Sequence, residues 1–201
     1  MGVVQRRERE KVALRKEILT AARELFAKEG YESVSMRRIA QRIEYSPTTI
    51  YLYFRDKHEL VAEICDETFA LLTRKLEKVV STEADPMAKL KTGLRAYVDF
   101  GRKHPEHYRV TLMMPHEHEP GKDIHSGPGA DAFQFLVASV TACMQAGRLR
   151  AGDVMAISQS LWCTVHGITS LQISHENCFP WVDRDFLIDS TINAVIRGFE
   201  P

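Results

Sequence analysis

Apolar side chains recur at intervals of three and four residues along nearly the whole chain of 201 residues. The first clear stretch places apolar side chains at positions i, i+3, i+4, i+7 and i+8, namely Ile18, Ala21, Ala22, Leu25 and Phe26. This spacing puts the apolar groups on one face of a helix, whereas a half-buried strand needs strict alternation, a pattern that the sequence does not offer. The sequence therefore predicts an all-α fold.

Start and stop signals divide this pattern into about nine helices. Gly30 supplies a left-handed residue that ends the first helix, and Ser35 is the expected N-cap of the second. Ser46 and Pro47 open the third, because proline costs nothing at the first helical position. Asp56, with Glu59 three residues further on, forms a capping-box-like start of the fourth. The expected ranges after the first helix are 36–43, 47–54, 56–80, 86–103, 108–113, 130–146, 153–174 and 183–198.

Charge is divided unequally along the chain. Lys+Arg is 27 and Asp+Glu is 27, so the formal net charge is zero. The first 60 residues nevertheless hold 13 basic and 9 acidic residues, a balance of +4, and the remainder carries −4. A basic end on an acidic body is typical of a nucleic-acid-binding module joined to another kind of domain.

Cysteine usage and hydropathy place the chain in the cytoplasm. The four cysteines are scattered with no C-x-x-C pair, which indicates reduced thiols. No apolar run approaches the ~18–20 residues that span a bilayer, and the charged residues 1–16 do not form a signal peptide. We therefore expect no membrane partner.

The helices at 36–43 and 47–54, joined by a tight turn, have the layout of a helix-turn-helix. In that motif the second helix presents its N-terminal residues to base edges, while nearby cations neutralise phosphates. Short hydroxyl side chains and phenols suit contacts to base edges. The cations that would flank this helix and neutralise phosphates are Arg37, Arg38, Arg42 and Lys57. The same layout also occurs in all-α folds that do not bind DNA. The candidate DNA-binding residues are Ser35, Arg37, Arg38, Tyr45, Ser46, Pro47, Thr48, Thr49, Tyr51, Tyr53 and Lys57.

Several segments resemble the N-terminal domain of the TetR (tetracycline-repressor) family. They are ILTAARELF at 18–26, Gly30-Tyr31, SMRRIA at 35–40, SPTTIYLYF at 46–54 and KHEL at 57–60. The resemblance implies an N-terminal three-helix helix-turn-helix domain at 1–56 and a helical ligand-binding and dimerisation domain at 57–201. It further implies a homodimeric repressor that releases double-stranded, palindromic operator DNA when a small-molecule effector binds.

Three positions depart from the family pattern. The family commonly has glycine where Glu44 and Thr48 stand, and often an acid where Arg38 stands. A glutamate in a left-handed turn costs ~1 kcal/mol, so a differently shaped turn and a strained, solvated Glu44 are both open. Arg38 gives up a capping box with Ser35 but adds positive charge.

The C-terminal half resembles the ligand domain of the so-called WHG-type TetR subgroup. Trp162, His166 and Gly167 carry that resemblance, and the last two helices would form the dimer interface as in the family. Trp162 and His166 share one helix face and either line an effector pocket or belong to the core. The candidate ligand-binding residues are Tyr97, Phe100, Tyr108, Met113, Met114, Phe133, Trp162 and His166, which suit a flat or lipophilic molecule.

A cluster of histidines and acids near 104–125 leaves a metal-responsive regulator as the alternative function. It contains His104, Glu106, His107, His116, Glu117, His118, Glu119, Asp123 and His125. Imidazole and carboxylate ligate first-row metals, yet no H-x-x-x-H pair is present and a solvated loop is the simpler interpretation. We assign no metal ligand and no cofactor. A hydrolase built on this cluster is a third class, but no catalytic motif appears and we do not expect an enzyme.

Overall fold

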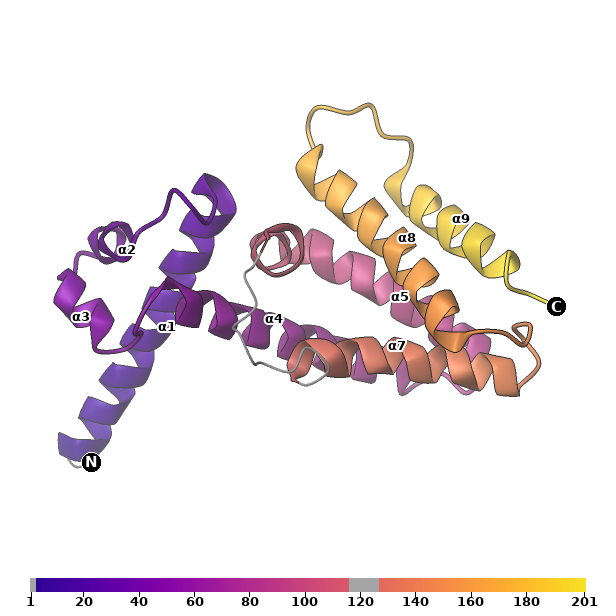
Figure 1. The fold of residues 1–201 in the computed structure, drawn as a ribbon, viewed down its shortest axis with the longest axis horizontal. Helices are drawn as coiled ribbons and strands as arrows, with labels where there is room; N and C mark the ends of the chain where they lie inside the picture. Colours follow the sequence, from indigo (N-terminus) through magenta and orange to yellow (C-terminus); the bar gives the residue numbers. More distant parts are fainter. Residues whose placement is uncertain (1–2, 116–126) are drawn as a thin grey trace. The chain divides into compact units, whose positions relative to one another are not determined.

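The computed structural model describes residues 3–115 and 127–201, and every regular element in these ranges is a helix (Figure 1). The all-α prediction is confirmed. The helices are α1 Val3–Glu29, α2 Met36–Arg42, α3 Pro47–Tyr51, α4 Lys57–Val80, α5 Pro86–Lys103, α6 Pro105–Tyr108, η1 Arg109–Met113, α7 Pro128–Gln145, α8 Val154–Ser174 and α9 Arg184–Arg197.

The described chain divides into two compact units. Unit 1 runs up to Thr68 and also contains the segment that begins at Glu106. Unit 2 contains Phe69–Pro105 and the described residues from Gly127 onward. The packing thus divides α4 at its middle, because the first turns of α4 bury Leu60, Val61 and Ile64 in the core of unit 1. The functional boundary at 56/57 stays a prediction.

Unit 1 is built on the predicted apolar face of α1. Ile18, Ala22 and Phe26 are at most 1% exposed and pack with α2, α3 and the start of α4. Gly30 adopts φ +82° directly after the helix, as its role as a left-handed terminator requires. Tyr31 then folds back, with its ring centroid 5.7 Å from that of Phe26.

Oxygen caps begin the helices at the predicted positions. Ser35 accepts a hydrogen bond from the Arg38 N–H, and Ser46 accepts one from the Thr49 N–H. Asp85, Asp153 and Asp183 cap α5, α8 and α9 in the same way. Each such cap contributes about 1 kcal/mol, so local chemistry fixes where the helices begin.

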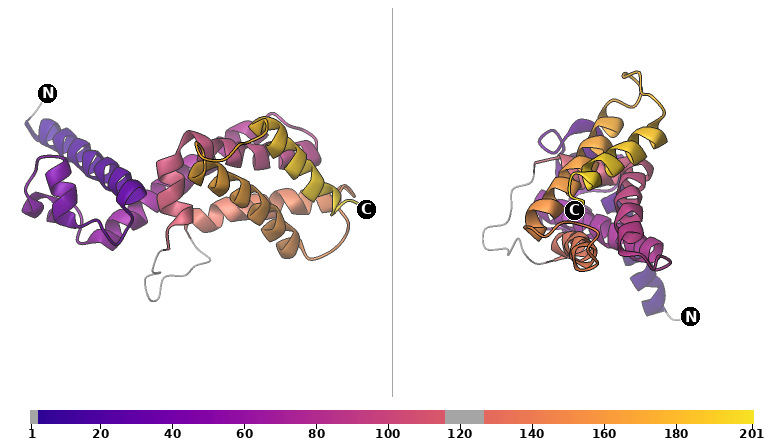
Figure 2. Two further views of the ribbon diagram at one scale, coloured as in Figure 1. Left: turned by 90° about the horizontal axis from the view of Figure 1, so that it is seen from above. Right: turned by 90° about the vertical axis from the view of Figure 1, so that its right-hand side faces the viewer.

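Unit 2 has α5 at its centre. This helix packs against α7, α8 and α9, and α8 and α9 run side by side (Figures 1 and 2). The buried face of α5 includes Leu90, Leu94 and Val98, and Leu161 and Val165 of α8 are equally buried. Helical spacing of apolar residues therefore builds this core as well.

Two elements differ from the expected ranges. Helix α3 ends at Tyr51, because the chain then turns so that the N–H groups of Tyr53 and Phe54 both bond to the Ile50 carbonyl. That turn places the Phe54 side chain in the core, where it is 0% exposed. The helix expected at 108–113 is a short α6 followed by a π-helical turn, η1. No helix in the described ranges is long and apolar enough to span a membrane.

Candidate nucleic-acid interface and ligand site

The N-terminus of α3 is held by its own side chains. Ser46 accepts the Thr49 N–H at 3.2 Å, and the two hydroxyl oxygens, Ser46 Oγ and Thr49 Oγ1, lie 2.9 Å apart. Pro47 occupies the first turn and is half-buried. Ile50 is fully buried and attaches the helix to the core of unit 1. The start of α3 is therefore a rigid platform.

Exposed side chains surround this platform. Tyr45 is 44% exposed and Tyr51 is 55% exposed, and the Thr48 side chain is exposed as well. Leu52 is 77% exposed, although sequence reasoning did not single it out. Its position two residues from both Ile50 and Phe54 was the available signal, because that offset puts it on the opposite face. Exposed large apolar and phenolic side chains around one short helix are typical of a surface that meets a partner.

The three arginines of α2 differ in how they are held. Arg38 contacts Glu29 at 3.0 Å, and Arg42 contacts Glu24 at 3.2 Å, so both guanidinium groups are anchored to α1. Arg37 is exposed. Arg38 thus replaces the missing capping box with an ion pair to α1, at the surface where such pairs contribute ~0–1 kcal/mol.

Two of the candidate residues serve the interior of unit 1. The Lys57 ammonium donates to the Tyr31 carbonyl at 2.7 Å and lies 3.9 Å from the centroid of the Tyr31 ring. Tyr53 is half-buried and packs against the core. Both residues hold the turn after α1 and the turn after α3 in place.

The turn between α2 and α3 is left-handed at Glu44, which has φ +61°. This is the conformation that favours glycine, and a non-glycine residue there costs about 1 kcal/mol. The Glu44 side chain is exposed, so the carboxylate stays solvated. The turn therefore keeps the geometry expected of glycine while carrying an acid.

Helix α4 begins at a charged cap. The Glu59 N–H donates to the Asp56 carboxylate at 2.9 Å, and this hydrogen bond holds the pKa of Asp56 below its ordinary value of 3.8. The Glu59 carboxylate in turn accepts the Arg55 N–H at 2.6 Å. The capping arrangement expected at Asp56 and Glu59 is present, with Arg55 as the outer donor.

Four of the candidate ligand-binding residues meet in unit 2. The Trp162 indole donates to the Tyr97 hydroxyl at 3.2 Å, and its ring lies 5.9 Å from both the Phe133 and the His166 rings. Trp162 is 37% exposed and is not a core residue. Burial lowers the pKa of His166, which favours the neutral imidazole. We call Tyr97, Phe133, Trp162 and His166 the aromatic set.

The other four candidate ligand-binding residues have other described contacts or belong to unit 1. Phe100 is buried, with its ring centroid 5.0 Å from that of His104. Tyr108, Met113 and Met114 belong to unit 1, where Met114 packs against the apolar core. The expected grouping of these three residues with the aromatic set stays a prediction.

Much of the histidine cluster lies outside the described residues, including His116, His118 and His125. Within the described residues no group of three His, Cys, Asp or Glu side chains is arranged to hold a metal ion. His107 is used structurally, since its Nδ1 lies 3.0 Å from the buried Thr68 hydroxyl.

Comparison with known proteins agrees with this architecture. Residues 18–64 match the model of the bacterial regulatory proteins of the tetR family, and residues 90–195 match the tetracyclin repressor-like C-terminal domain. A helix-turn-helix transcriptional regulator of Haemophilus influenzae is 35% identical over 68 residues, which cover 34% of this chain and 36% of that protein.

Solved structures share the fold along almost the whole chain. A protein of unknown function from Rhodococcus sp. RHA1 is 25% identical with a TM-score of 0.76, covering 94% of this chain and 96% of that one. A tetR-family regulatory protein from Rhodococcus RHA1 is 21% identical with a TM-score of 0.73, covering 92% and 96%. The two family models together account for the helix-turn-helix and for more than half of the chain beyond it, and the chain belongs to the TetR family of transcriptional regulators.

Proposed function

We propose that the protein is a ligand-responsive repressor that binds a palindromic operator as a homodimer. Members of its family are typically repressors of this kind. The observation that carries the proposal is the start of α3, a rigid platform ringed by exposed polar and phenolic side chains. Two copies of α3 would enter successive major grooves, ~34–36 Å apart.

We divide the predicted DNA-binding residues into two roles on the basis of their hydrogen bonds and exposure. Thr49 is half-buried and bonded to Ser46, so these two hydroxyls position the helix N-terminus. Thr48 and Tyr51 are exposed, and we assign base and phosphate contacts to them. Arg37 is the arginine of α2 that is not tied to α1 by a described ion pair, which makes it the strongest candidate for phosphate neutralisation.

Salt titration of operator binding tests the DNA-binding role. An operator is first selected from random double-stranded DNA, and the association constant is then measured across salt concentrations. Each phosphate contact that is lost lowers the slope of log K against log salt by about 0.9. Arg37→Gln removes one such contact from each of the two protomers and should lower the slope by about 1.8, while Arg74→Gln, an exposed arginine of unit 2, should keep the wild-type slope. Salt-independent binding, or failure to select any sequence, would refute the proposal.

One ridge of α8 is the proposed dimer interface. Met155, Cys163, Gly167 and Leu171 follow one another at intervals of four or eight residues on its exposed face. Leu171 is 53% exposed, and a Cβ at Gly167 would meet open space within this chain. Phe186 of α9 is 68% exposed. Such an apolar face, with a glycine that permits close approach, suits the four-helix contact between two copies.

Leu171→Glu tests the interface. A charge buried in the dimer contact should cost more than 2 kcal/mol, so the variant should run as a monomer of 22.9 kDa in light scattering while the wild type runs at twice that mass. Val12→Glu introduces the same charge at an exposed apolar residue of α1 and should stay dimeric. A dimeric Leu171→Glu would place the interface elsewhere.

We assign effector binding to the aromatic set. A neutral His166 beside two aromatic rings and a phenol favours a flat or lipophilic molecule. Binding of such a molecule would quench or shift Trp162 fluorescence. It would release the operator by population shift, with α4 as the connecting element because its two halves belong to different units. Assignment to the WHG type, from Trp162, His166 and Gly167, remains a prediction.

A further inference from the structure

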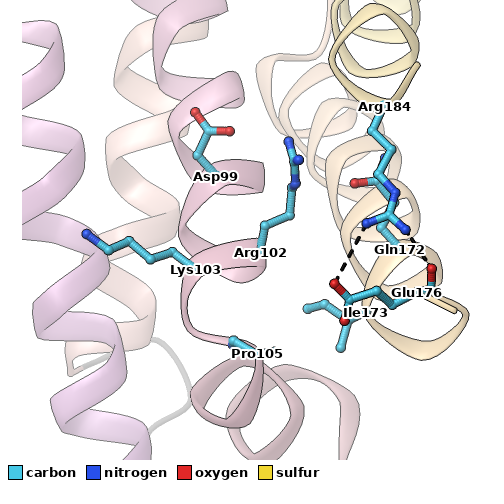
Figure 3. Close-up of a pocket in the computed structure, with 8 residues that line it drawn as sticks. All are labelled: Asp99, Arg102, Lys103, Pro105, Gln172, Ile173, Glu176 and Arg184. Atoms are coloured by element: carbon cyan, nitrogen blue, oxygen red, sulfur yellow. Dashed lines mark hydrogen bonds and ion pairs between the residues drawn. The ribbon is translucent and has the colours of Figure 1, made fainter.

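A polar pocket of about 360 Å³ lies in unit 2. Its walls are the C-terminal end of α5, the C-terminal end of α8 and the start of α9 (Figure 3). Arg102 stands on the α5 wall, while Gln172 and Arg184 stand on the opposite one. The pocket shares no lining residue with the proposed effector site.

Gln172 is the unusual member of this pocket. Its side chain is 2% exposed, and no described residue forms a hydrogen bond with either its Nε2 or its Oε1 atom. A buried amide without partners is destabilising, because it has lost its hydrogen bonds to water. The carboxamide lies beside Arg184 on the α8 wall and faces the space before α5 (Figure 3). A ligand with matching donor and acceptor groups would satisfy both atoms.

The charged groups around Gln172 are unequally compensated. The Arg184 guanidinium donates to the Glu176 carbonyl at 2.6 Å and lies 3.8 Å from the carboxylate of the same residue. Asp99 is paired with Arg95 at 3.3 Å. These contacts neutralise both acids of the lining.

Arg102 shares its carboxylate partner, Asp185, with Arg95. It donates to Asp185 Oδ1 at 2.7 Å, and Arg95 donates to the same oxygen at the same distance. Asp185 is 61% exposed, so this shared contact is open to water and to competition. A guanidinium has five N–H donors, and the bond to Asp185 uses one of them. Arg102 therefore keeps the capacity to bind an anion.

We propose that this pocket binds a small 2-hydroxy monocarboxylate. The carboxylate would accept hydrogen bonds from Arg102 and from Gln172 Nε2, because a planar anion matches the guanidinium fork. The hydroxyl would donate to Gln172 Oε1, and the carbon skeleton would pack on Ile173, which is 6% exposed. The carboxylate, the hydroxyl and the carbon skeleton of the ligand would thus each have a partner in the pocket. The site makes no use of the proposed DNA-binding residues, and its walls on α8 and α9 adjoin the proposed dimer interface.

Calorimetric titration of the full wild-type protein tests the ligand class. Lactate and mandelate are the probes, since they present the same head group on skeletons of two sizes. Propionate and phenylacetate lack the hydroxyl, and lactamide and mandelamide lack the charge. At least one hydroxy acid should bind with a Kd of about 1 mM or tighter, and its two analogues should bind roughly tenfold or more weakly. No binding of either hydroxy acid, or equal binding of an analogue, overturns the proposal.

Two variants locate the site. Gln172→Met keeps the shape of the side chain without its amide, and Arg102→Gln removes the guanidinium. Both should weaken hydroxy-acid binding roughly tenfold or more, whereas Arg74→Gln should bind as the wild type does. Unchanged binding in Gln172→Met would overturn the assignment.

The Tm of the ligand-free protein supplies an independent readout. Gln172→Met should raise it, because the variant no longer buries an amide that lacks partners. A lower Tm would mean that the carboxamide already has partners in the protein and is not reserved for a ligand. The comparison of hydroxy acids with their analogues uses the wild-type protein, so it does not depend on whether either variant folds.

Discussion

Helices α1–α3 and helices α8–α9 distribute their polar and apolar groups in opposite ways. The cluster beneath α2 and α3 is built of apolar side chains, and Ser46 and Thr48 at the start of α3 are exposed. Helix α8 buries Ser158, Thr169 and Gln172, yet it leaves Leu171 half exposed. Exposed apolar residues on a helix indicate a surface that another molecule covers, and its buried polar groups need hydrogen-bond partners.

This difference indicates two kinds of dependence on partners. The first unit packs an apolar core of its own and exposes polar and phenolic side chains around α3, although it also buries Arg23 Nε and Thr111 Oγ1 without a described hydrogen bond. The second unit has an exposed apolar ridge and an unsatisfied amide, which favour a second copy of the chain and a polar ligand. Three substitutions test how far this contrast extends.

Phe54→Ala should give the largest effect and should be confined to unit 1. Phe54 is 0% exposed, and truncation of a buried phenylalanine costs about 3–5 kcal/mol. The chain's two tryptophans, Trp162 and Trp181, both lie in unit 2, so indole fluorescence follows unit 2 alone. We expect an early loss of helical circular dichroism and of operator binding, with the fluorescence transition almost unchanged.

Leu161→Ala is the matched control for that experiment. Leu161 is 1% exposed in unit 2, and its truncation should move the fluorescence transition by about 2–5 kcal/mol. If each variant shifts the circular-dichroism and fluorescence transitions equally, the two units unfold together. The contrast between them would then have no effect on their stability.

Glu44→Gly should stabilise unit 1 by about 1 kcal/mol. Glycine adopts the observed φ of +61° without the steric cost that glutamate bears. Chemical denaturation followed by circular dichroism would detect the gain. Glu32→Gly makes the same replacement in another turn, where φ is not positive, and should destabilise by about 0.4–1 kcal/mol. A gain at both positions would mean that backbone strain at Glu44 is not the cause.

His166→Phe should have the smallest effect and should appear as a change in pH dependence. Burial lowers the pKa of His166 below 6.5, so the unfolded chain takes up a proton there before the folded chain does. The contribution of His166 to the stability of unit 2 is therefore greatest above pH 6.5, and it is lost as the pH falls toward the pKa of His166 in the folded protein. His166→Phe should lose less stability than the wild type between pH 7.5 and 5.5, as measured by indole fluorescence. The exposed His175→Phe is the control and should follow the wild type.

Local signals predicted most of the fold. Ser35, Ser46 and Asp56 were expected as caps, and each accepts the backbone N–H of the residue three positions ahead. The apolar face of α1 was equally readable, because burial follows the helical period. These features depend on residues within one or two turns of each other, which is the range over which sequence patterns carry information.

The candidate sites were predicted less completely. The pattern Ser46 to Phe54 identified the helix-turn-helix, but it did not distinguish exposed Thr48 from hydrogen-bonded Thr49. Nor did it show that the Lys57 ammonium would contact the Tyr31 carbonyl, a partner 26 positions away. Such choices among neighbours depend on which groups the fold brings into contact.

The helical class, the helix starts and the family are readable from residue order, because caps, glycine terminators and apolar spacing act locally. The three-dimensional packing was needed to show that Tyr108 and Met114 belong to unit 1, and that Arg102 and Gln172 line one pocket. Those last two residues lie on α5 and α8, and no pattern along one helix records which polar group of another helix will face it. The reason is physical: partners are assigned by packing, after the helices have formed their own hydrogen bonds.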